Sequence, residues 1–265
     1  MKNDQLFIIK VGGNIIDHTE KLSAFLNHFS SLPQKKILIH GGGKIASDIG
    51  DKLGIKSNYI NGRRITDTET INLVTMVYAG LINKKIVAKL QALNVNAIGL
   101  TGADGNCIPA IKRPIKDIDF GWVGDIQEGK INISQWKLFI ENDLVPIVAP
   151  LTHDQKGHLL NTNADTVASA IAVALSKSYE VTLVYCFERK GVLDDIKNEN
   201  SIIKNINRES FNQLQKENKV AEGILPKIEN ALSAIDAGVS KIIIGHSDDI
   251  IANVNGESKG TTIYK

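Results

Sequence analysis

A lysine two residues before a pair of glycines is the feature of this sequence best suited to chemistry. Lys10 lies near the end of an apolar run, residues 6–11, and Gly12 and Gly13 follow it. A second glycine run, residues 41–43, follows the apolar run 36–39. Glycines after a strand let backbone N–H groups approach an anion, and a lysine adds positive charge beside them. The pattern predicts an anion site, while a tight turn with a lysine reaching water would give the same spacing.

Neither glycine run matches a common nucleotide motif. A P-loop needs another glycine where Leu38 stands and a serine or threonine where Ile45 stands. Gly41, Gly43 and Ala46 fit a degenerate dinucleotide fingerprint, but the acidic residue expected about 20 positions later is absent. A Rossmann oxidoreductase would therefore rest on a weak motif.

The elements expected to position these residues alternate between strands and helices. Helix-period apolar patterns run through residues 68–93, 164–175 and 224–237. Strand-like apolar runs recur at 6–11, 36–39, 97–100, 145–149, 181–185 and 241–244. This alternation predicts an α/β fold, an αβα sandwich around a mainly parallel sheet. The polar stretch 188–222 is expected to hold exposed loops and short elements.

The composition is that of an ordinary globular enzyme. Of 265 residues, 43% are hydrophobic, and the formal net charge is +2, which gives no support for nucleic-acid or membrane partners. Cys107 and Cys186 lack metal-ligand spacing, and no disulfide is expected. We expect no signal peptide, no apolar stretch near the ~20 residues of a membrane span, and a cytoplasmic location.

Further motifs give the sequence a specific resemblance. NGRRITD (61–67), GLTGADG (99–105), GWVGD (121–125), LLNTNAD (159–165) and EGILPKIENAL (222–232) follow one another in this order. With the two glycine runs, they resemble the acetylglutamate kinases of the amino acid kinase family over essentially the whole chain. The resemblance implies an N-terminal lobe, residues 1–170, for acylglutamate binding and dimerisation. A C-terminal lobe, residues 171–265, would bind ATP.

The resemblance also implies a reaction and its residues. ATP would phosphorylate the γ-carboxylate of N-acetyl-L-glutamate, a step of arginine biosynthesis, with Mg²⁺ carried by ATP and no metal site of the protein. Lys10 and Lys227 would contact the transferring phosphate, and Asp165 would pair with both. The acceptor is already a carboxylate, so no general base is needed. Phosphate-binding residues would be Gly12 and Gly13, and substrate-binding residues Gly42, Gly43, Arg64, Asn161 and Asn163.

Several of these residues have simpler explanations. Asn163 or Asp165 could cap the helix 164–175, and Arg64 could be a surface charge. His40, which precedes the second glycine run, is interpreted as structural. Helix 68–93 would form the contact of a homodimer by resemblance, or be an ordinary core helix.

Three features depart from the family pattern. Arg63 stands where a leucine is usual, which suits an acyl group ending in a carboxylate, such as succinyl, and a solvent-facing Arg63 fits the sequence equally well. The segment 185–193 lacks the usual Thr/Ser-Asp-Val, so it is assigned no contact with ATP. Nine residues precede Lys10, so a dimer without inhibition by arginine is expected.

Rival functions fit the motifs less well. Aspartate, carbamate and uridylate kinases share the early lysine followed by two glycines, here Lys-Val-Gly-Gly, but NGRRIT with LLNTNAD favours the acylglutamate branch. A non-catalytic amino-acid-binding module is disfavoured because Lys10, Lys227 and Asp165 are all present.

Overall fold

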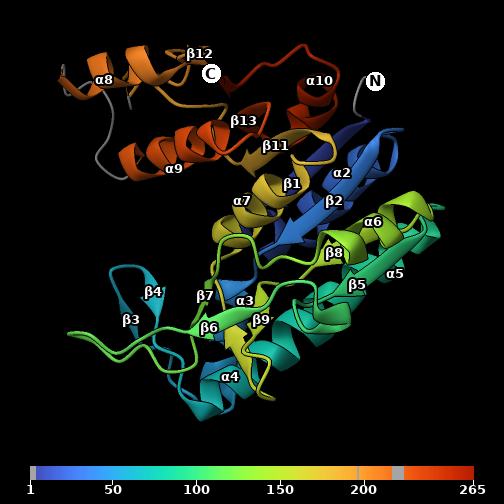
Figure 1. Ribbon diagram of the computed structural model, residues 1–265, viewed down its shortest axis with the longest axis vertical. Helices are drawn as coiled ribbons and strands as arrows, with labels where there is room; N and C mark the ends of the chain where they lie inside the picture. Colours follow the sequence, from blue (N-terminus) through green and yellow to red (C-terminus); the bar gives the residue numbers. More distant parts are fainter. Residues whose placement is uncertain (1–3, 196, 217–223) are drawn as a thin grey trace.

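A mainly parallel sheet of eight strands runs through the molecule (Figure 1). The computed structural model describes residues 4–195, 197–216 and 224–265. The sheet order is β12-β14-β13-β11-β1-β2-β8-β5, and β13–β14 is its antiparallel pair. The strands are β1 (Gln5–Val11), β2 (Lys35–His40), β5 (Ala97–Leu100), β8 (Val145–Val148), β11 (Glu180–Phe187), β12 (Asn205–Ile206), β13 (Lys241–His246) and β14 (Thr261–Ile263). The predicted fold class is confirmed.

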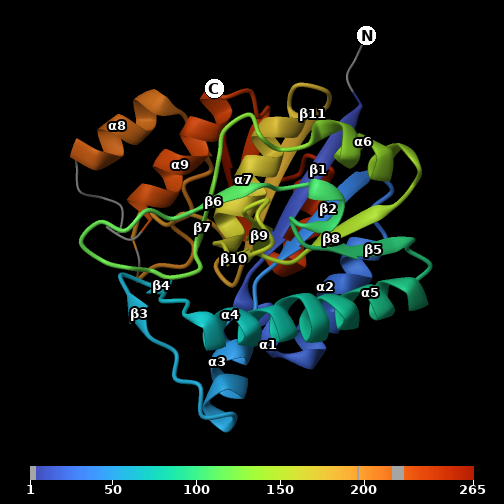
Figure 2. The same ribbon diagram turned by 60° about the horizontal axis from the view of Figure 1, so that its bottom comes forward.

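Helices cover both faces of the sheet (Figure 2). On one face lie α6 (Ile133–Glu141), α7 (Ala164–Leu175), α8 (Arg208–Lys216) and α9 (Leu225–Asp236). On the other lie α2 (Thr19–Ser30), α3 (Gly43–Lys52), the long helix formed by α4 (Thr68–Val74), η1 (Thr75–Ile82) and α5 (Asn83–Ala92), and α10 (Ile250–Val254). The short helix α1 (Gly13–Asp17) follows β1 directly.

Alternation along β1 decides which face each side chain joins. Leu6 and Ile8 belong to the core under α7 and α9, whereas Phe7 and Ile9 belong to the core under α2 and the long helix. Successive strand residues point to opposite faces, so Lys10 lies on the same face as Leu6 and Ile8. The lysine is thereby directed toward α7 and α9.

The long helix is π-helical in its middle, over η1. By length and composition alone, Thr68–Ala92 could span a membrane, which differs from the expectation that no apolar stretch approaches that length. A helix in the core of a globular protein can have the same length and composition. Its buried side chains, among them Leu73, Val77 and Ile86, belong to the core beside the sheet. The fold therefore explains its apolar character as that of a core helix.

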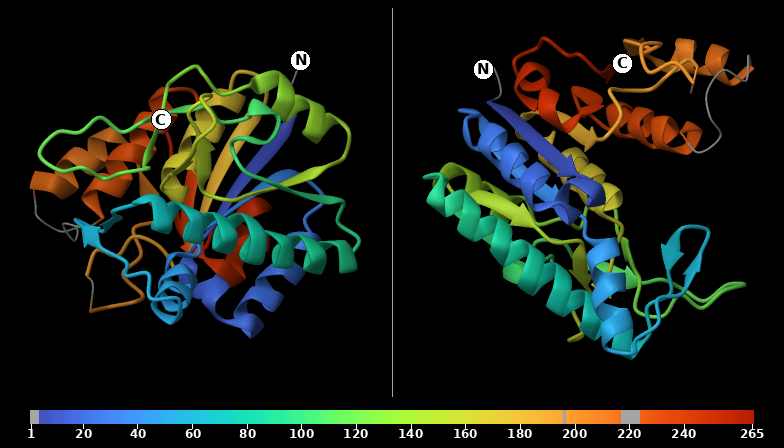
Figure 3. Two further views of the ribbon diagram at one scale, coloured as in Figure 1. Left: turned by 90° about the horizontal axis from the view of Figure 1, so that it is seen from below. Right: turned by 180° about the vertical axis from the view of Figure 1, so that it is seen from behind.

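Three small hairpins extend beyond the sheet and carry cleft residues (Figure 3). They are β3–β4 (Tyr59–Ile60 and Arg63–Arg64), β6–β7 (Ala110–Lys112 and Gly124–Ile126) and β9–β10 (Leu151–His153 and Leu159–Asn161). In Figure 1 the β3–β4 hairpin and the start of α9 lie on the same side of the molecule, with a gap between them. Residues of both line the cleft described below.

Most predicted elements are present with small shifts of boundary. All six strands occur, and the helices predicted at 164–175 and 224–237 are α7 and α9. Both cysteines are free and buried, as expected. The stretch 188–222 contains β12 and α8. Residues 196 and 217–222 of this stretch lie outside the described residues, as do the first two residues of the EGILPKIENAL motif, 222 and 223. The boundary predicted between residues 170 and 171 falls within α7, which packs against β1, β2 and β11.

Candidate active site

The predicted lysine lies where the strand order of the sheet reverses. On one side of β1 lie β2, β8 and β5. On its other side lie β11, β13, β14 and β12, which come later in the chain. Lys10 is paired in register with Tyr185 of β11, one residue before β1 ends. In open α/β sheets, ligands bind at the carboxyl ends of strands at such a switch point. The topology therefore places Lys10 at the expected edge for a ligand.

A cleft of about 1250 Å³ opens at this edge. Of the predicted site residues, it is lined by Gly42, Gly43, Arg63, Arg64, Asn161, Asn163, Asp165 and Lys227. A smaller cavity of about 320 Å³ beside it is lined by Gly12, Gly13 and again Lys227. Lys10 lines neither cavity, and its side chain is only 10% exposed. The structure thus brings the predicted residues together around two adjoining spaces.

Lys10 forms an ion pair with Asp165 at the start of α7. The distance from Lys10 Nζ to Asp165 Oδ1 is 2.8 Å. The cap of α7 is Asn163, whose Oδ1 accepts hydrogen bonds from the backbone N–H groups of Asp165 and Thr166 at 2.9 and 3.1 Å. Because Asn163 caps the helix, the Asp165 carboxylate is available to Lys10.

Lys227 has a different partner. Its Nζ lies 4.8 Å from the ring centroid of Phe187, and Lys10 Nζ lies 5.2 Å from the same centroid. In the described part of the chain, no carboxylate lies within ion-pair distance of Lys227. Pairing with Asp165, expected for both lysines, is therefore observed for Lys10 alone. We call Lys10, Asp165, Phe187 and Lys227 the lysine cluster.

Arg64 is buried at the opposite side of the cleft, at 6% exposure. Its Nη2 donates to Gly43 O at 2.8 Å and to Ser47 Oγ at 3.0 Å, and its Nη1 donates to Ser57 Oγ. The guanidinium carbon lies 4.8 Å from the ring centroid of Tyr59. With these contacts Arg64 is not the free surface charge that was the simpler explanation for it. The neighbouring Arg63 is exposed and lines the cleft. We call residues 41–43, Ser47, Ser57, Tyr59 and Arg64 the arginine cluster.

The second glycine run fits under the π-helical part of the long helix. Gly42 has φ 148°, a conformation that residues with a side chain rarely adopt. A Cβ at Gly42 would overlap Cδ1 of Ile82 and lie 3.3 Å from the Tyr78 ring. Glycine at this position lets η1 pack closely against the loop, and places Tyr78 on the cleft.

His40 is buried beneath the same loop. Its Nδ1 contacts Gly41 O at 2.8 Å, and its Nε2 contacts Asn83 Nδ2 at 3.2 Å. The carbonyl oxygen can only accept, so Nδ1 carries the proton and Nε2 accepts from Asn83, which also donates to Ile147 O at 2.9 Å. Burial lowers the pKa of His40 to about 4, so the ring is neutral at pH 7. This arrangement suits the structural role predicted for His40.

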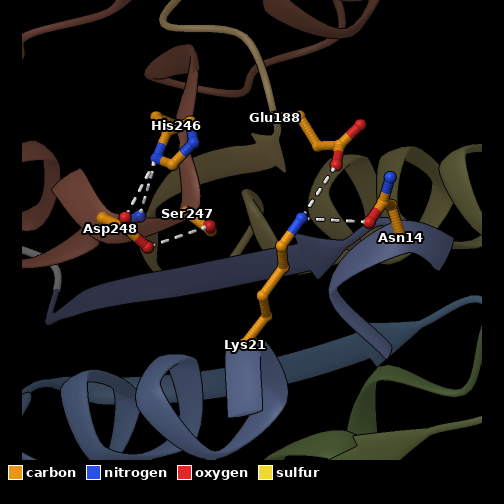
Figure 4. Close-up of polar contacts among 6 residues, drawn as sticks. All are labelled: Asn14, Lys21, Glu188, His246, Ser247 and Asp248. Atoms are coloured by element: carbon orange, nitrogen blue, oxygen red, sulfur yellow. Dashed lines mark hydrogen bonds and ion pairs between the residues drawn. The ribbon is translucent and has the colours of Figure 1, made fainter. Parts of the chain in front are cut away.

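Asn161 and Lys21 make further polar contacts around the site. Asn161 Nδ2 donates to Thr66 Oγ1 at 3.0 Å, which orients Asn161 at the cleft. Figure 4 shows Lys21 Nζ between Asn14 Oδ1 and Glu188 Oε1, 3.3 Å from each. Asn14 and Glu188 line the smaller cavity, so Lys21 ties segment 185–193 to α1. The same view shows His246 beside Asp248, at the end of β13.

Several site residues were not identified from the sequence: Ser47, Ser57, Tyr59, Tyr78, Asn83, Tyr185 and Phe187. Ser47 lies four residues after Gly43, so helical spacing could have placed it beside the glycine run. Phe187 follows Tyr185 by two residues, so strand alternation could have placed both rings on one face. Asn83 and Ser57 carry no such signal, because their contacts depend on segments distant in sequence.

The chain is similar to known proteins over nearly its whole length. The model of the amino acid kinase family matches residues 5–246. The chain is 51% identical over 252 residues to an acetylglutamate kinase of Cytophaga hutchinsonii, with 95% of each chain covered. It is 50% identical over 262 residues to an acetylglutamate kinase of Phocaeicola vulgatus, with 99% of each covered.

Solved structures show the same fold. The crystal structure of smu.665 from Streptococcus mutans UA159 superposes with a TM-score of 0.77 at 26% identity, covering 98% of both chains. With nearly full-length matches in sequence and in structure, the chain belongs to the amino acid kinase family, within its acetylglutamate kinases.

Proposed function

We propose that the protein transfers the γ-phosphoryl group of ATP to the γ-carboxylate of N-acetyl-L-glutamate, a step of arginine biosynthesis. The observation that carries this proposal is the cleft of about 1250 Å³, which is lined by Arg64 of the arginine cluster and by Asp165 and Lys227 of the lysine cluster. A buried arginine suits a carboxylate, since its planar fork can donate two parallel hydrogen bonds. Lysines suit the charge that develops on a phosphoryl group in transfer. A cytoplasmic location, where ATP is available, goes with this proposal.

In this reaction the protein needs mainly to position the two substrates and to stabilise negative charge. A carboxylate oxygen of the substrate attacks the γ-phosphorus, a new O–P bond forms, and the bond to the β–γ bridging oxygen breaks to release ADP. No proton moves, so no general base takes part. In this proposal Lys10 and Lys227 stabilise the transferring group and the leaving oxygen, and Asp165 orients Lys10. N–H groups of Gly12, Gly13, Gly42 and Gly43 contribute further donors.

Substrate binding is assigned to the arginine cluster and its neighbours. Arg64 and Asn161 would hold the α-carboxylate and the acylamino group of the glutamate, with Asn163 nearby as the α7 cap. Of the carboxylates that line the cleft, Asp165 and Asp125 are paired with Lys10 and Arg113 at 2.8 and 2.6 Å, and Glu128 is exposed. Among the described residues, no three His, Cys, Asp or Glu side chains gather into a group that could hold a metal ion. Mg²⁺ therefore enters this proposal on the phosphates of ATP, where it neutralises their charge.

The test is acyl-phosphate formation, trapped with hydroxylamine. ATP and Mg²⁺ would be supplied with N-acetyl-, N-succinyl- or free L-glutamate in parallel. We expect hydroxamate from N-acetyl-L-glutamate and none without ATP. Absence of product from all three would refute the proposal in favour of a non-catalytic binding module.

A second acyl substrate, N-succinyl-L-glutamate, is favoured by one observation. Arg63 is exposed, lines the cleft, and precedes Arg64 on the β3–β4 hairpin. Its cation could pair with the terminal carboxylate of a succinyl group. Arg63→Leu should then lower kcat/KM for the succinyl substrate alone. The control is Lys116→Leu, which removes an exposed cation that lines neither cavity. An unchanged acyl preference in Arg63→Leu would refute this alternative.

We also propose that the protein is a homodimer, with the long helix at its contact. Met76 and Leu81 of η1 are 56% and 37% exposed. Large apolar side chains on one exposed helix are typical of a protein contact surface. Met76→Lys combined with Leu81→Lys should shift the mass measured by sedimentation from dimer to monomer. A monomeric native protein would refute the proposal.

A further inference from the structure

Phe187 belongs to segment 185–193, to which the proposed function assigns no role. It ends β11, and its side chain is half-buried. The residue lines both the cleft of about 1250 Å³ and the cavity of about 320 Å³. Lys227 is shared by the same two spaces. Phe187 therefore forms part of the boundary across which the two cavities meet.

One aromatic ring serves two cations here. Lys10 Nζ and Lys227 Nζ lie 5.2 and 4.8 Å from the centroid of Phe187, both within the range of a cation–π contact. Two ammonium groups around one ring repel each other, and Asp165 contacts Lys10 alone among them. In the described residues, Lys227 has no paired carboxylate to offset this repulsion. The negative face of the Phe187 ring attracts Lys227 Nζ at this distance.

The ring is itself held in place. Phe187 stacks on Tyr185, with centroids 6.1 Å apart and ring planes 13° apart. The Tyr185 hydroxyl donates to the backbone oxygen of Asp165 at 3.4 Å. Lys10, Tyr185 and Phe187 lie on one face of adjacent strands, because Lys10 and Tyr185 are in register. The start of α7, the two rings and the two lysines thus form one continuous contact.

We propose that Phe187 is a positioning residue, which holds the ammonium groups of Lys10 and Lys227 around the phosphoryl path before nucleotide binds. The catalytic part of this inference, that the two lysines act on a phosphoryl group, rests on the proposed function. An aromatic ring attracts both cations without a formal negative charge, so it does not repel an incoming phosphate as a carboxylate would. Phosphate oxygens, which bind ammonium more strongly, can then take over both lysines.

Steady-state kinetics of two Phe187 variants test the positioning role. Phe187→Leu keeps an apolar side chain and removes the ring, and kcat should fall roughly 3- to 30-fold. KM for the acylglutamate should change less than about twofold, because the arginine cluster is untouched. Phe187→Tyr keeps the ring and should retain most of kcat. The matched control is Phe120→Leu, which removes a ring 5.3 Å from the Arg113 guanidinium and lining neither cavity.

Two kinetic outcomes would overturn the inference. One is a kcat of Phe187→Leu within twofold of the native value. The other is an equal loss in Phe187→Tyr and Phe187→Leu, which would show that shape rather than the π face matters. Unfolding midpoints of all variants, measured in urea, separate both outcomes from misfolding.

A second measurement does not depend on activity. In ¹H–¹³C spectra of the native protein, the ε-methylene signals of Lys10 and Lys227 should be shifted upfield by the ring. Phe187→Leu should remove both shifts, while those of Lys36 over Phe29 and Lys112 over Trp122 persist. Unchanged Lys227 signals would refute the contact. An inactive native protein that shows the expected shifts would instead refute the proposed function and leave the contact standing.

Discussion

The arginine cluster and the lysine cluster face one cleft but are held by different forces. Arg64 is 6% exposed and donates hydrogen bonds to a carbonyl and to two hydroxyls. Lys227 is exposed and rests on the face of one ring. Hydrogen bonds fix direction closely, whereas a cation–π contact leaves an ammonium group free to turn. One side of the cleft is thus preorganised for a planar carboxylate, and on the other the positioned ammonium groups can still turn toward a phosphoryl group as it moves.

The polar contacts next to the two clusters also differ, because those of the arginine cluster are buried and those of the lysine cluster are exposed. Beneath the arginine cluster, buried His40 and Asn83 tie the glycine run to β8 through Ile147 O. Beside the lysine cluster, segment 185–193 is tied to α1 by Lys21, whose contacts to Asn14 and Glu188 are exposed. Buried networks are costly to break, and exposed ion pairs contribute little. Substitutions on the two sides should therefore differ in what they change.

Lys10→Met should give the largest effect, because it removes a charge that acts on the transferring group. We expect kcat to fall about 10²- to 10³-fold, with KM for the acylglutamate nearly unchanged. The hydroxylamine assay measures both, and Lys10→Arg, which keeps the charge, is the matched control. A rise in KM at constant kcat would place Lys10 in substrate binding instead.

Arg64→Lys should weaken substrate binding more than catalysis. A lysine cannot reproduce the donors that reach Gly43, Ser47 and Ser57, so the cluster loses its fixed geometry. KM for the acylglutamate should rise roughly 10- to 100-fold, as expected for charged hydrogen bonds to a carboxylate. Arg63→Lys, next to it and exposed, serves as the control and should change KM less than about threefold. An equal rise in KM for Arg64→Lys and Arg63→Lys would contradict the assignment of substrate binding to the buried Arg64.

Stability should fall below neutral pH because His40 is buried as a neutral ring. Its folded pKa of about 4 lies below the ordinary value of 6.5, so the unfolded chain binds more protons between these values. Stability is fully present above pH 6.5 and declines as pH falls toward 4. For this group the loss from pH 7 to pH 5 is about 2 kcal/mol.

Urea unfolding at pH 7 and pH 5 measures this loss. The same two measurements on His40→Gln, which cannot titrate, provide the control. The native protein should lose more stability than the variant over this range. Equal losses in the two proteins would show that His40 is not held neutral.

Lys21→Ala should give the smallest effect. Its side chain is 54% exposed, and the contact to Glu188 is an exposed ion pair. We expect less than about 1 kcal/mol of destabilisation in urea unfolding, reduced further by salt. A larger loss would show that segment 185–193 is fixed as firmly as the arginine cluster.

Much of the fold and part of the site could be predicted from local sequence. The strand Ala97–Leu100 and the helix Ala164–Leu175 occur with the predicted bounds, since apolar period and length are local properties. Lys10, Asp165, Arg64 and Lys227 were predicted from motifs, and they lie around one edge of the sheet. The helix Thr19–Ser30 was not predicted, although its Leu22, Phe25, Leu26 and Phe29 have helical spacing.

The sequence by itself determined the alternation of strands and helices and the residue types of the site. It determined that Lys10 lies on the face of Leu6 and Ile8, because strand alternation is a backbone property. Only the tertiary structure decided that Asp165 pairs with Lys10 and not also with Lys227, and that Phe187 meets both lysines. Those outcomes depend on how β1, β11, α7 and α9 pack, and their distances along the chain leave no local signal of that packing.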